Sequence, residues 1–502
     1  MPVQYTRRDV LGAGAMALSG AAIALTPGYS PRGQSLPSAL HYLSLVEAAR
    51  LIETTEISPV ELTQVMLDRI DLVDSRLNSY ATVMRDSALA QAAAAEQEIS
   101  SGRYRGPLHG VPVAVKDLCF TAGVPTMGGL LMLRDHVPEF DATVVTRLSA
   151  AGAVLLGKLN MTEGALAGYH PEFQVPVNPW DVDRWAGASS SGSGAATAAG
   201  LCFASLGSDT LGSIRFPSAC CGLVGLKPTY GRVSRHGILP LAESLDHIGP
   251  MARTSADVAI MFEAIAGLDP NDSTSLPDSV LPMLQGIDEG VSGLRVGFDE
   301  RHSTEDVDPG LVTAIRSSLE VMKSLGARVI PVTFPELDAS APSLIAGADA
   351  VAAHSATYPA RRNDYGAMLS SFLDANASIT GVQYANAHRE RLEFRGRLRS
   401  MMEPVDVFVC PSMPGPAYPA RPDQLYGTVE EIRSLFAANN LSFTAPFNLS
   451  GSPTISMPCG FSDEGLPYSV QFVGKHLDEA LLCRIGHAYE QATDWHTRHP
   501  MV

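Results

Sequence analysis

The chain has no excess of basic residues, no regular cysteine spacing and no long apolar run. Its 36 Lys and Arg residues are outnumbered by 53 Asp and Glu, which gives a formal net charge of −17 at pH 7. This balance argues against a nucleic-acid partner, because such proteins present basic patches to phosphates. The seven cysteines are scattered through apolar segments, so we expect buried thiols rather than a disulfide framework.

No metal-binding or nucleotide-binding motif stands out. The segment Gly152–Lys158 has the spacing of a phosphate-binding loop but lacks the Ser or Thr that should follow the lysine. His496 and His499 stand alone in a polar tail, and Asp269 with Asp272 is typical of a turn rather than a calcium loop. We therefore expect no metal site and no cofactor.

The N-terminus carries an arginine pair followed by an uncharged stretch. Arg7 and Arg8 precede Val10–Leu25, which is rich in glycine and alanine. A membrane-spanning helix needs roughly 20 apolar residues, so this stretch is too short to span a bilayer, and no other stretch is long enough. The pattern is typical of a twin-arginine export signal at residues 1–30, with Ala22–Ala24 resembling a cleavage site.

This signal predicts a bacterial protein that is periplasmic or secreted, with the twin-arginine translocation machinery as a partner. The alternative is an uncleaved arm on a cytoplasmic protein. The buried thiols are compatible with export, because twin-arginine substrates fold before they are translocated. The sequence does not indicate an oligomeric state.

Length and apolar content indicate one large α/β core. The chain has 502 residues, 45% of them hydrophobic, and no clear boundary divides it in the middle. Strand-like runs such as Ala153–Leu156 alternate with helical stretches such as Leu311–Leu325. The polar segment Asp269–Ser292 predicts a surface connection into a more variable part at about residues 293–400.

Two segments rich in serine and glycine, Trp185–Gly194 and Ser208–Arg215, follow each other closely. Glycine lets the backbone approach a substrate, and serine hydroxyls both donate and accept protons. A flexible linker is the alternative. However, the first segment leads into the helix-favouring Ala195–Ala199 and the apolar Leu201–Leu206, which indicates that it is embedded in a core. The two segments therefore suggest a serine nucleophile.

A serine nucleophile needs a base, and a lysine offers one. No Gly-x-Ser-x-Gly elbow opens from a strand, which disfavours an α/β-hydrolase, although His236 and His247 can in principle fold close by. Lys116 ends the apolar run Leu108–Val115, which predicts a buried strand that carries this lysine into the interior. Burial lowers a lysine pKa, so a neutral Lys116 can act as the base. A structural ion pair with Asp117 is the alternative.

Together these segments resemble the amidase signature family of hydrolases. The resemblance extends from about residues 43–46 to the C-terminus, and its motifs are Gly110–Asp117, Gly157–Glu163, the serine-rich segment, Gly212–Pro217, Cys221–Thr229, Asn448–Pro453 and Gly465–Pro467. It implies an α/β fold whose central mixed, mostly parallel sheet is surrounded by helices. It also implies a catalytic domain at 37–502, with a core at about 106–260, a variable substrate-selecting part at about 293–400 and a C-terminal core part at about 401–500.

Matched by position, the family's Ser-Ser-Lys triad falls on Lys116 as base, Ser189 as bridging serine and Ser213 as nucleophile. The resemblance further implies a cis Ala188–Ser189 peptide bond and a helix that starts at Ser213. It implies an oxyanion hole made by the backbone N–H groups of Thr210, Leu211, Gly212 and Ser213.

Three further residues are expected to support the site. Ser190 is expected either to hydrogen-bond Lys116 or to cap a helix. Asp209 is expected to orient the oxyanion loop, and Arg215 to pair with a buried carboxylate. Leu211 stands where family members mostly carry glycine; if that position requires a positive φ, leucine costs about 1 to 2 kcal/mol, and its side chain can intrude on the acyl pocket.

The resemblance implies a cofactor-free amidase that cleaves a carboxamide C–N bond to a carboxylate plus ammonia or an amine through an acyl-enzyme. Its partner is then a small-molecule or short-peptide amide. A carbamate or ester hydrolase of the same family is an alternative. A glutamine-dependent amidotransferase A-type subunit conflicts with the export signal and the acidic balance, and a non-catalytic scaffold has Leu211 as its main support.

Overall fold

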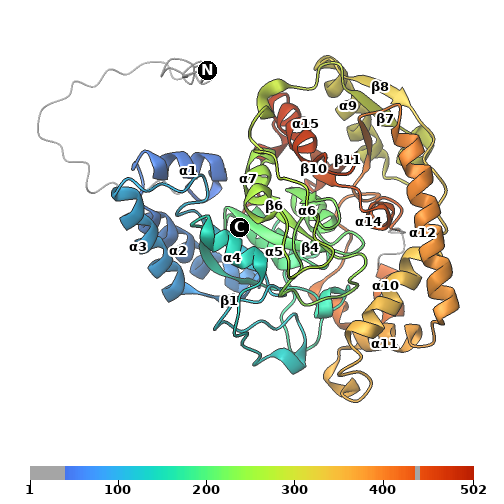
Figure 1. Ribbon diagram of the computed structural model, residues 1–502, viewed down its shortest axis with the longest axis horizontal. Helices are drawn as coiled ribbons and strands as arrows, with labels where there is room; N and C mark the ends of the chain where they lie inside the picture. The colour runs from blue at the N-terminus through green and yellow to red at the C-terminus, as the bar shows by residue number, and fades with distance from the viewer. Residues whose placement is uncertain (1–39, 436–440) are drawn as a thin grey trace, which may run out of the picture. The chain divides into compact units, whose positions relative to one another are not determined.

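An eleven-stranded sheet runs through the part of the chain that the computed structural model describes, residues 40–435 and 441–502 (Figure 1). The strand order is β1-β3-β2-β4-β6-β5-β10-β11-β9-β7-β8. The strands are β1 (Tyr80–Val83), β2 (Pro112–Lys116), β3 (Val154–Leu159), β4 (Ala204–Asp209), β5 (Val224–Lys227), β6 (His247–Ala252), β7 (Arg295–Phe298), β8 (Arg328–Pro331), β9 (Val407–Pro411), β10 (Thr454–Phe461) and β11 (Pro467–Gly474). The predicted export signal at 1–30 lies outside the described residues.

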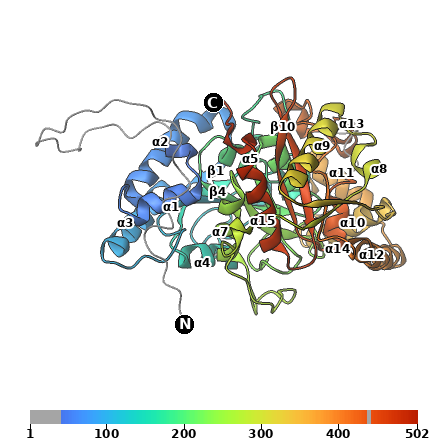
Figure 2. The ribbon, with the colours of Figure 1, turned by 90° about the horizontal axis from the view of Figure 1, so that it is seen from above.

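Helices surround this sheet. They are α1 (Leu45–Glu53), α2 (Pro59–Leu77), α3 (Arg85–Ser100), α4 (Thr143–Ala150), α5 (Ser191–Ala198), α6 (Arg215–Cys221), α7 (Ser255–Ile265), α8 (Glu300–Thr304), α9 (Pro309–Ser324), α10 (Ser340–Ala353), α11 (Ala367–Asn376), α12 (Gly381–Met402), α13 (Val429–Leu435), α14 (Ala445–Ser450) and α15 (Glu479–Gln491). Helices α1 to α3 gather beside the β1 end of the sheet, and α12 lies on the opposite side (Figures 1 and 2).

The described sheet is mixed, with antiparallel pairs in the majority. The pairs β2–β3, β2–β4, β7–β8 and β7–β9 are parallel. The remaining six neighbouring pairs are antiparallel. The prediction of a mixed sheet surrounded by helices is confirmed, but the predicted parallel majority is wrong. Parallel neighbours need a long crossover, such as α4 between β2 and β3, whereas the short turn between β10 and β11 permits only antiparallel pairing.

Local sequence signals account for several element boundaries. The predicted helix at 311–325 is α9, which starts with proline after an Asp308 cap that accepts from the Leu311 N–H. The predicted strand at 153–156 is the buried β3. The predicted surface connection at Asp269–Ser292 is mostly exposed or half-buried, and its one described helix is the short 3-10 helix Ile287–Glu289. All seven cysteines are free and buried, as expected.

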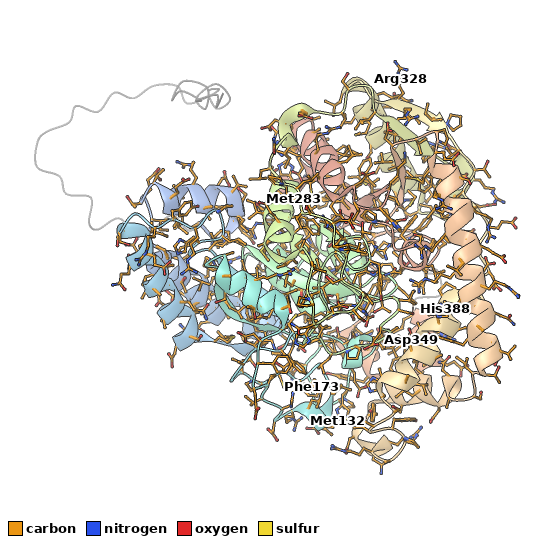
Figure 3. The ribbon with its side chains drawn as sticks, viewed as in Figure 1. Met132, Phe173, Met283, Arg328, Asp349 and His388 are labelled. Atoms are coloured by element: carbon orange, nitrogen blue, oxygen red, sulfur yellow. The ribbon has the colours of Figure 1, made fainter. Side chains whose placement is uncertain are left out.

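Side chains fill the space between the sheet and the helices (Figure 3). At the far edge of the sheet, the exposed Arg328 of β8 projects outward, which discourages pairing with another strand (Figure 3). None of the described helices is both long and apolar enough to cross a membrane. The strands that matter for the site are β2 and β4, which lie side by side in the buried centre.

Candidate active site

Lys116 lies at the end of the buried strand β2, and its side chain is fully buried. Its Nζ lies 2.6 Å from Ser189 Oγ, 3.0 Å from Ser190 Oγ and 2.8 Å from Ser208 Oγ. The first two serines precede α5, and the third is near the end of β4, the parallel neighbour of β2. Two segments thus bring three hydroxyl groups to the amine at the end of β2.

No carboxylate forms an ion pair with Lys116 among the described residues. Asp117 pairs with Lys158 instead, at 3.2 Å, so the expected alternative of a Lys116–Asp117 ion pair is wrong. The pairing of β2 with β3 explains why: Lys158 lies opposite Val115, so Lys158 and Lys116 point to opposite faces of the sheet. Burial lowers the pKa of Lys116 to about 7, and the more distant Asp246 and Asp209 only partly offset this effect.

The serine-rich segment begins with a cis Ala188–Ser189 peptide bond, as the resemblance implied. Ser190 occupies the N-cap position of α5, but its side chain makes no capping hydrogen bond. Instead, Ser190 Oγ accepts from Lys116 and donates to the carbonyl of Ser208. The contact with Lys116 was therefore the correct alternative for Ser190.

Ser208 is a site residue that the sequence analysis missed. Ser208 reaches Lys116 because β2 and β4 are parallel neighbours, so that their carboxyl ends lie at the same edge of the sheet. The pairing itself has no signature in the sequence.

Ser213 lies in the loop between β4 and α6 and is partly exposed. Its Oγ forms no hydrogen bond with Ser189 Oγ, or with any other group, in the described chain. The contact between Ser189 and Ser213 that the predicted triad requires is therefore not formed in this structure. The predicted helix start at Ser213 is wrong, because α6 begins at Arg215 with Ile214 at the N-cap position. Ser213 instead borders a cavity.

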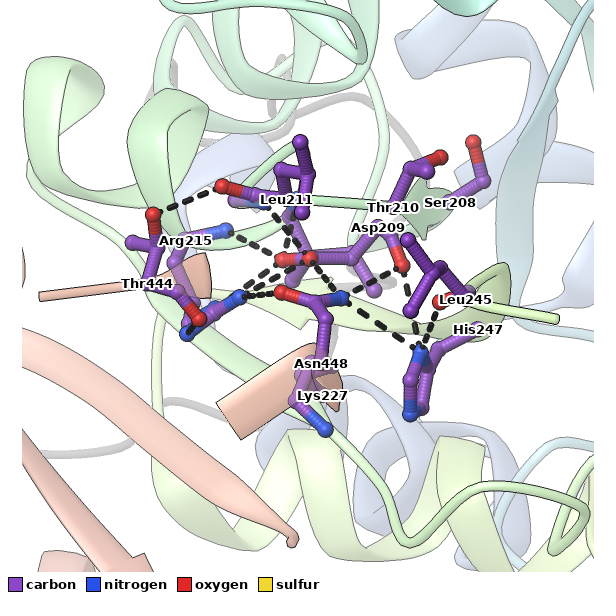
Figure 4. Close-up of polar contacts among 12 residues, drawn as sticks. Ser208, Asp209, Thr210, Leu211, Arg215, Lys227, Leu245, His247, Thr444 and Asn448 are labelled. Atoms are coloured by element: carbon purple, nitrogen blue, oxygen red, sulfur yellow. Dashed lines mark hydrogen bonds and ion pairs between the residues drawn. The ribbon is translucent and has the colours of Figure 1, made fainter. Parts of the chain in front are cut away.

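Asp209 organises the loop that carries Ser213 (Figure 4). Its carboxylate accepts hydrogen bonds from the backbone N–H groups of Gly212, at 2.7 Å, and Ile214, at 3.1 Å. It also accepts from the Arg215 guanidinium at 3.0 and 2.9 Å and from Asn448 Nδ2 at 2.8 Å. The expected loop contacts of Asp209 and the expected pairing of Arg215 with a buried carboxylate are both present.

These partners stabilise the ionised form of Asp209. Burial by itself raises the pKa of Asp209, but the fully buried Arg215 guanidinium outweighs burial and holds the pKa below its ordinary value. Arg215 reaches further, donating to the Thr444 carbonyl at 2.9 Å and to Asn448 Oδ1. The loop is therefore anchored to α14, more than 200 residues away in sequence.

The four predicted oxyanion donors differ in their availability. The N–H of Gly212 already donates to Asp209, whereas those of Thr210, Leu211 and Ser213 form no hydrogen bond within the described residues. Leu211 does not have a positive φ, so the backbone strain considered for leucine is absent. Gly212 does, with φ 138°, and a Cβ there would lie 2.4 Å from the Phe216 ring.

A cavity of about 590 Å³ opens beside Ser213. Its walls are mostly apolar, and its lining residues are Ala165, Leu166, Ala167, Trp185, Ala188, Thr210, Leu211, Ser213, Phe216, Leu241, Ser343, Ala346, Met368, Phe372, Ile432, Arg433 and Leu441. The predicted variable part, 293–400, contributes residues of α10 and α11 to this lining. Leu211 is one of these lining residues.

The histidines considered as bases are engaged elsewhere. His247 Nδ1 lies 2.6 Å from the Leu245 carbonyl, and burial lowers the pKa of His247 well below its ordinary value. His236 stacks on Phe140. Within the described ranges, no group of three or more His, Cys, Asp or Glu residues could hold a metal ion. Lys116 is therefore the base candidate that serine hydroxyls surround.

Comparison with known proteins yields matches along most of the chain. The family model described as Amidase matches residues 61–483. The protein AmiD of Mycobacterium tuberculosis is 44% identical over 472 residues, which cover 92% of this chain and 97% of AmiD. The A-type subunit of the glutamyl-tRNA(Gln) amidotransferase of Chloroflexus aurantiacus is 37% identical over 492 residues, which cover 92% of this chain and 99% of that relative.

A solved structure agrees with these sequence matches. The native peptide amidase from Stenotrophomonas maltophilia superposes with a TM-score of 0.79 at 30% identity, covering 93% of this chain and 99% of the peptide amidase. The likeness therefore includes both the sheet and the helices around it.

Proposed function

The chain belongs to the amidase family and is an amide hydrolase, and from this premise we propose that Lys116, Ser189 and Ser213 cleave a carboxamide C–N bond. The products are a carboxylate and ammonia or an amine. The observation that carries the proposal is the position of Lys116: a fully buried amine with three serine hydroxyls and no carboxylate partner in the described chain.

Near neutral pH a large fraction of Lys116 is uncharged, because its pKa is about 7. A neutral amine has two N–H donors and one lone pair, which matches three hydroxyl neighbours. Ser190 donates its own proton to a carbonyl, so it must accept from Lys116. The short contact with Ser189 then suits the lone pair, which draws the proton from the Ser189 hydroxyl.

In the proposed reaction, rotation of the Ser213 side chain brings its hydroxyl to Ser189 Oγ. Lys116 takes the Ser189 proton, Ser189 takes the Ser213 proton, and Ser213 Oγ attacks the amide carbon. The relay returns the proton to the leaving nitrogen as the C–N bond breaks. Water, deprotonated through the same relay, then hydrolyses the acyl-enzyme and releases the carboxylate.

The negative oxygen of the tetrahedral intermediate needs aligned donors. We assign this role to the free N–H groups of Thr210, Leu211 and Ser213, and we assign Gly212 the task of holding the loop through its bond to Asp209. Loss of one such donor costs on the order of a hundredfold in rate. The loop is rigid before substrate arrives, because Asp209 and Arg215 tie it to α14.

The cavity favours an amide with a bulky apolar group, since aromatic and aliphatic side chains form most of its lining. A carbamate or ester with the same apolar group fits the same walls and is the nearest alternative. A glutamine-dependent amidotransferase subunit fits less well: glutamine is polar, and a net charge of −17 does not suit a tRNA-bound complex.

We further propose that the twin-arginine translocation machinery exports the protein to the periplasm or beyond. The support is the Arg7–Arg8 pair and the uncharged stretch that follows it. Lysine substitutions at both arginines should leave the protein in the cytoplasm of a bacterial host, whereas the unaltered chain should appear in the periplasmic or secreted fraction. Equal distribution of the two chains would contradict export by this route.

The test of the proposed chemistry is a panel of primary amides, anilides, peptide amides, carbamates and esters with matched apolar groups. Purified protein is compared with Ser213→Ala and Lys116→Met, and a fluorophosphonate probe is followed by intact mass. We expect amide turnover that both substitutions abolish, and one probe adduct that Ser213→Ala prevents. Turnover that survives Ser213→Ala would exclude this serine as nucleophile, and absence of turnover and adduct would favour a scaffold.

A further inference from the structure

The cavity beside Ser213 contains one formal charge. Arg433, on α13, is the single ionisable side chain in its lining, and the other lining residues are apolar or carry a hydroxyl. Arg433 is exposed, so it lies where the cavity meets solvent. Within the described residues, its guanidinium forms no hydrogen bond and no ion pair. A cation without a partner therefore borders an otherwise apolar space that also holds the proposed nucleophile.

Some arginines elsewhere in this acidic chain pair with carboxylates, whereas others, such as Arg328 and Arg399, form no ion pair within the described residues. Arg362 reaches Asp374 at 2.7 Å, and Arg397 reaches Glu390 at 2.6 Å. In the same helix, Glu431 accepts from the Thr428 N–H at 2.7 Å, and Glu430, three residues before Arg433, forms no ion pair with it within the described residues. What distinguishes Arg433 from the other unpaired arginines is that it lines the cavity beside Ser213.

An anion that reaches Arg433 from inside the cavity has apolar walls on one side, so water screens their attraction less than at an open surface. The planar donors of a guanidinium match the two oxygens of a carboxylate. Building on the amide hydrolysis proposed above, we propose that Arg433 determines specificity by binding a carboxylate on the substrate, at the far end of an apolar group from the scissile amide.

The cavity walls between Ser213 and Arg433 determine which apolar group of the substrate fits. Ala346 of α10 and Met368 and Phe372 of α11 line the same cavity as Ser213 and Arg433. A volume of about 590 Å³ admits a chain or ring of several carbon atoms. The substrate class is therefore an amide joined through an apolar spacer to a carboxylate, such as the monoamide of a long dicarboxylic acid.

The experiment uses pairs of amides that differ at one end. Monoamides of α,ω-dicarboxylic acids of increasing length are compared with alkanamides in which a methyl group replaces the carboxylate. Each pair is assayed with the unaltered protein, Arg433→Ala, Arg433→Lys and Arg433→Glu. The control is Arg399→Ala, which removes an exposed arginine of α12 that does not line this cavity.

With the unaltered protein, we expect kcat/KM to favour the carboxylate member of the pair at one preferred length. Arg433→Ala should lower kcat/KM for that member by about tenfold, the lower end of what a charge-assisted hydrogen bond supplies, because Arg433 is partly solvated. The methyl member should be unchanged. Arg433→Lys should restore part of the loss. Arg433→Glu should reverse the preference toward an amide that ends in an ammonium group.

Two outcomes overturn the inference while the proposed function stands: equal losses for both members of a pair, or no loss with Arg433→Ala while Ser213→Ala still abolishes turnover. If no amide is hydrolysed by the unaltered protein, the failure belongs to the proposed function instead. In that case, calorimetry compares binding of the carboxylate compounds to Ser213→Ala with and without the added Arg433→Ala substitution. This comparison tests Arg433 without any turnover.

Discussion

Lys116 Nζ lies 2.6 Å from Ser189 Oγ, while the next residue, Asp117, lies just beyond the end of β2 and pairs with Lys158 of β3 at 3.2 Å. Two adjacent residues therefore have different partners, which separates the proposed base, Lys116, from a structural ion pair. Lys116 is left with hydroxyl partners, and burial can then lower its pKa without an opposing carboxylate in contact.

Activity should therefore depend on a group that loses its proton near neutrality. The pKa of Lys116 is lowered to about 7, and the neutral form is the base, so kcat/KM should rise with pH and reach half of its plateau near pH 7. The measurement is kcat/KM from pH 5 to 9 with a neutral amide. A profile that stays flat down to pH 5 would show that no such base operates.

Ser208→Ala should move this acidic limb to lower pH. The Ser208 hydroxyl lies 2.8 Å from Lys116 Nζ and stabilises the ammonium form, so its removal should lower the pKa of Lys116 further, by up to about one unit. Ser205→Ala, in the same strand but bonded to Thr197 instead, is the matched control and should leave the limb in place. A shift toward higher pH would contradict the contact assigned to Ser208.

Asp209→Asn should destabilise the protein and reduce kcat together. It leaves the buried Arg215 without its countercharge, and loss of one partner of a buried ion pair costs about 3 to 5 kcal/mol. Urea unfolding measures the loss. Adding Arg215→Met should recover part of the stability but not the activity, because the loop contacts to Gly212 and Ile214 stay impaired. A stability unchanged by Asp209→Asn would rule out this role.

Leu211→Gly should lower stability and widen specificity. Because Leu211 does not have a positive φ, glycine relieves no strain, and it removes packing against the cluster that contains Ala242 and Leu245. We expect a loss of about 1 to 3 kcal/mol in the free energy of unfolding and a higher kcat/KM ratio for bulky over small amides. Leu211→Ala separates the lost side chain from backbone freedom. Greater stability of the glycine variant would indicate hidden strain.

Much of the site follows from local pattern. An apolar, β-branched run predicts the buried strand that ends in Lys116, and the small-residue segments predict where the serines lie. Proline and an aspartate cap mark the start of α9. These features depend on neighbours a few residues away, and the resemblance of the motifs to a known family extends them to the cis bond before Ser189.

Long-range packing settles what such patterns leave open. The pairing of β2 with β3 decides whether Lys116 or Lys158 pairs with Asp117. The pairing of β2 with β4 brings Ser208 to the Lys116 amine. Strand direction across the sheet and the anchoring of Arg215 to Asn448 involve segments far apart in sequence. Sequence patterns predict local structure and burial, because these depend on residues that are close together in the chain. Which groups become neighbours is decided in the assembled sheet, because segments of the whole chain compete there for the same contacts.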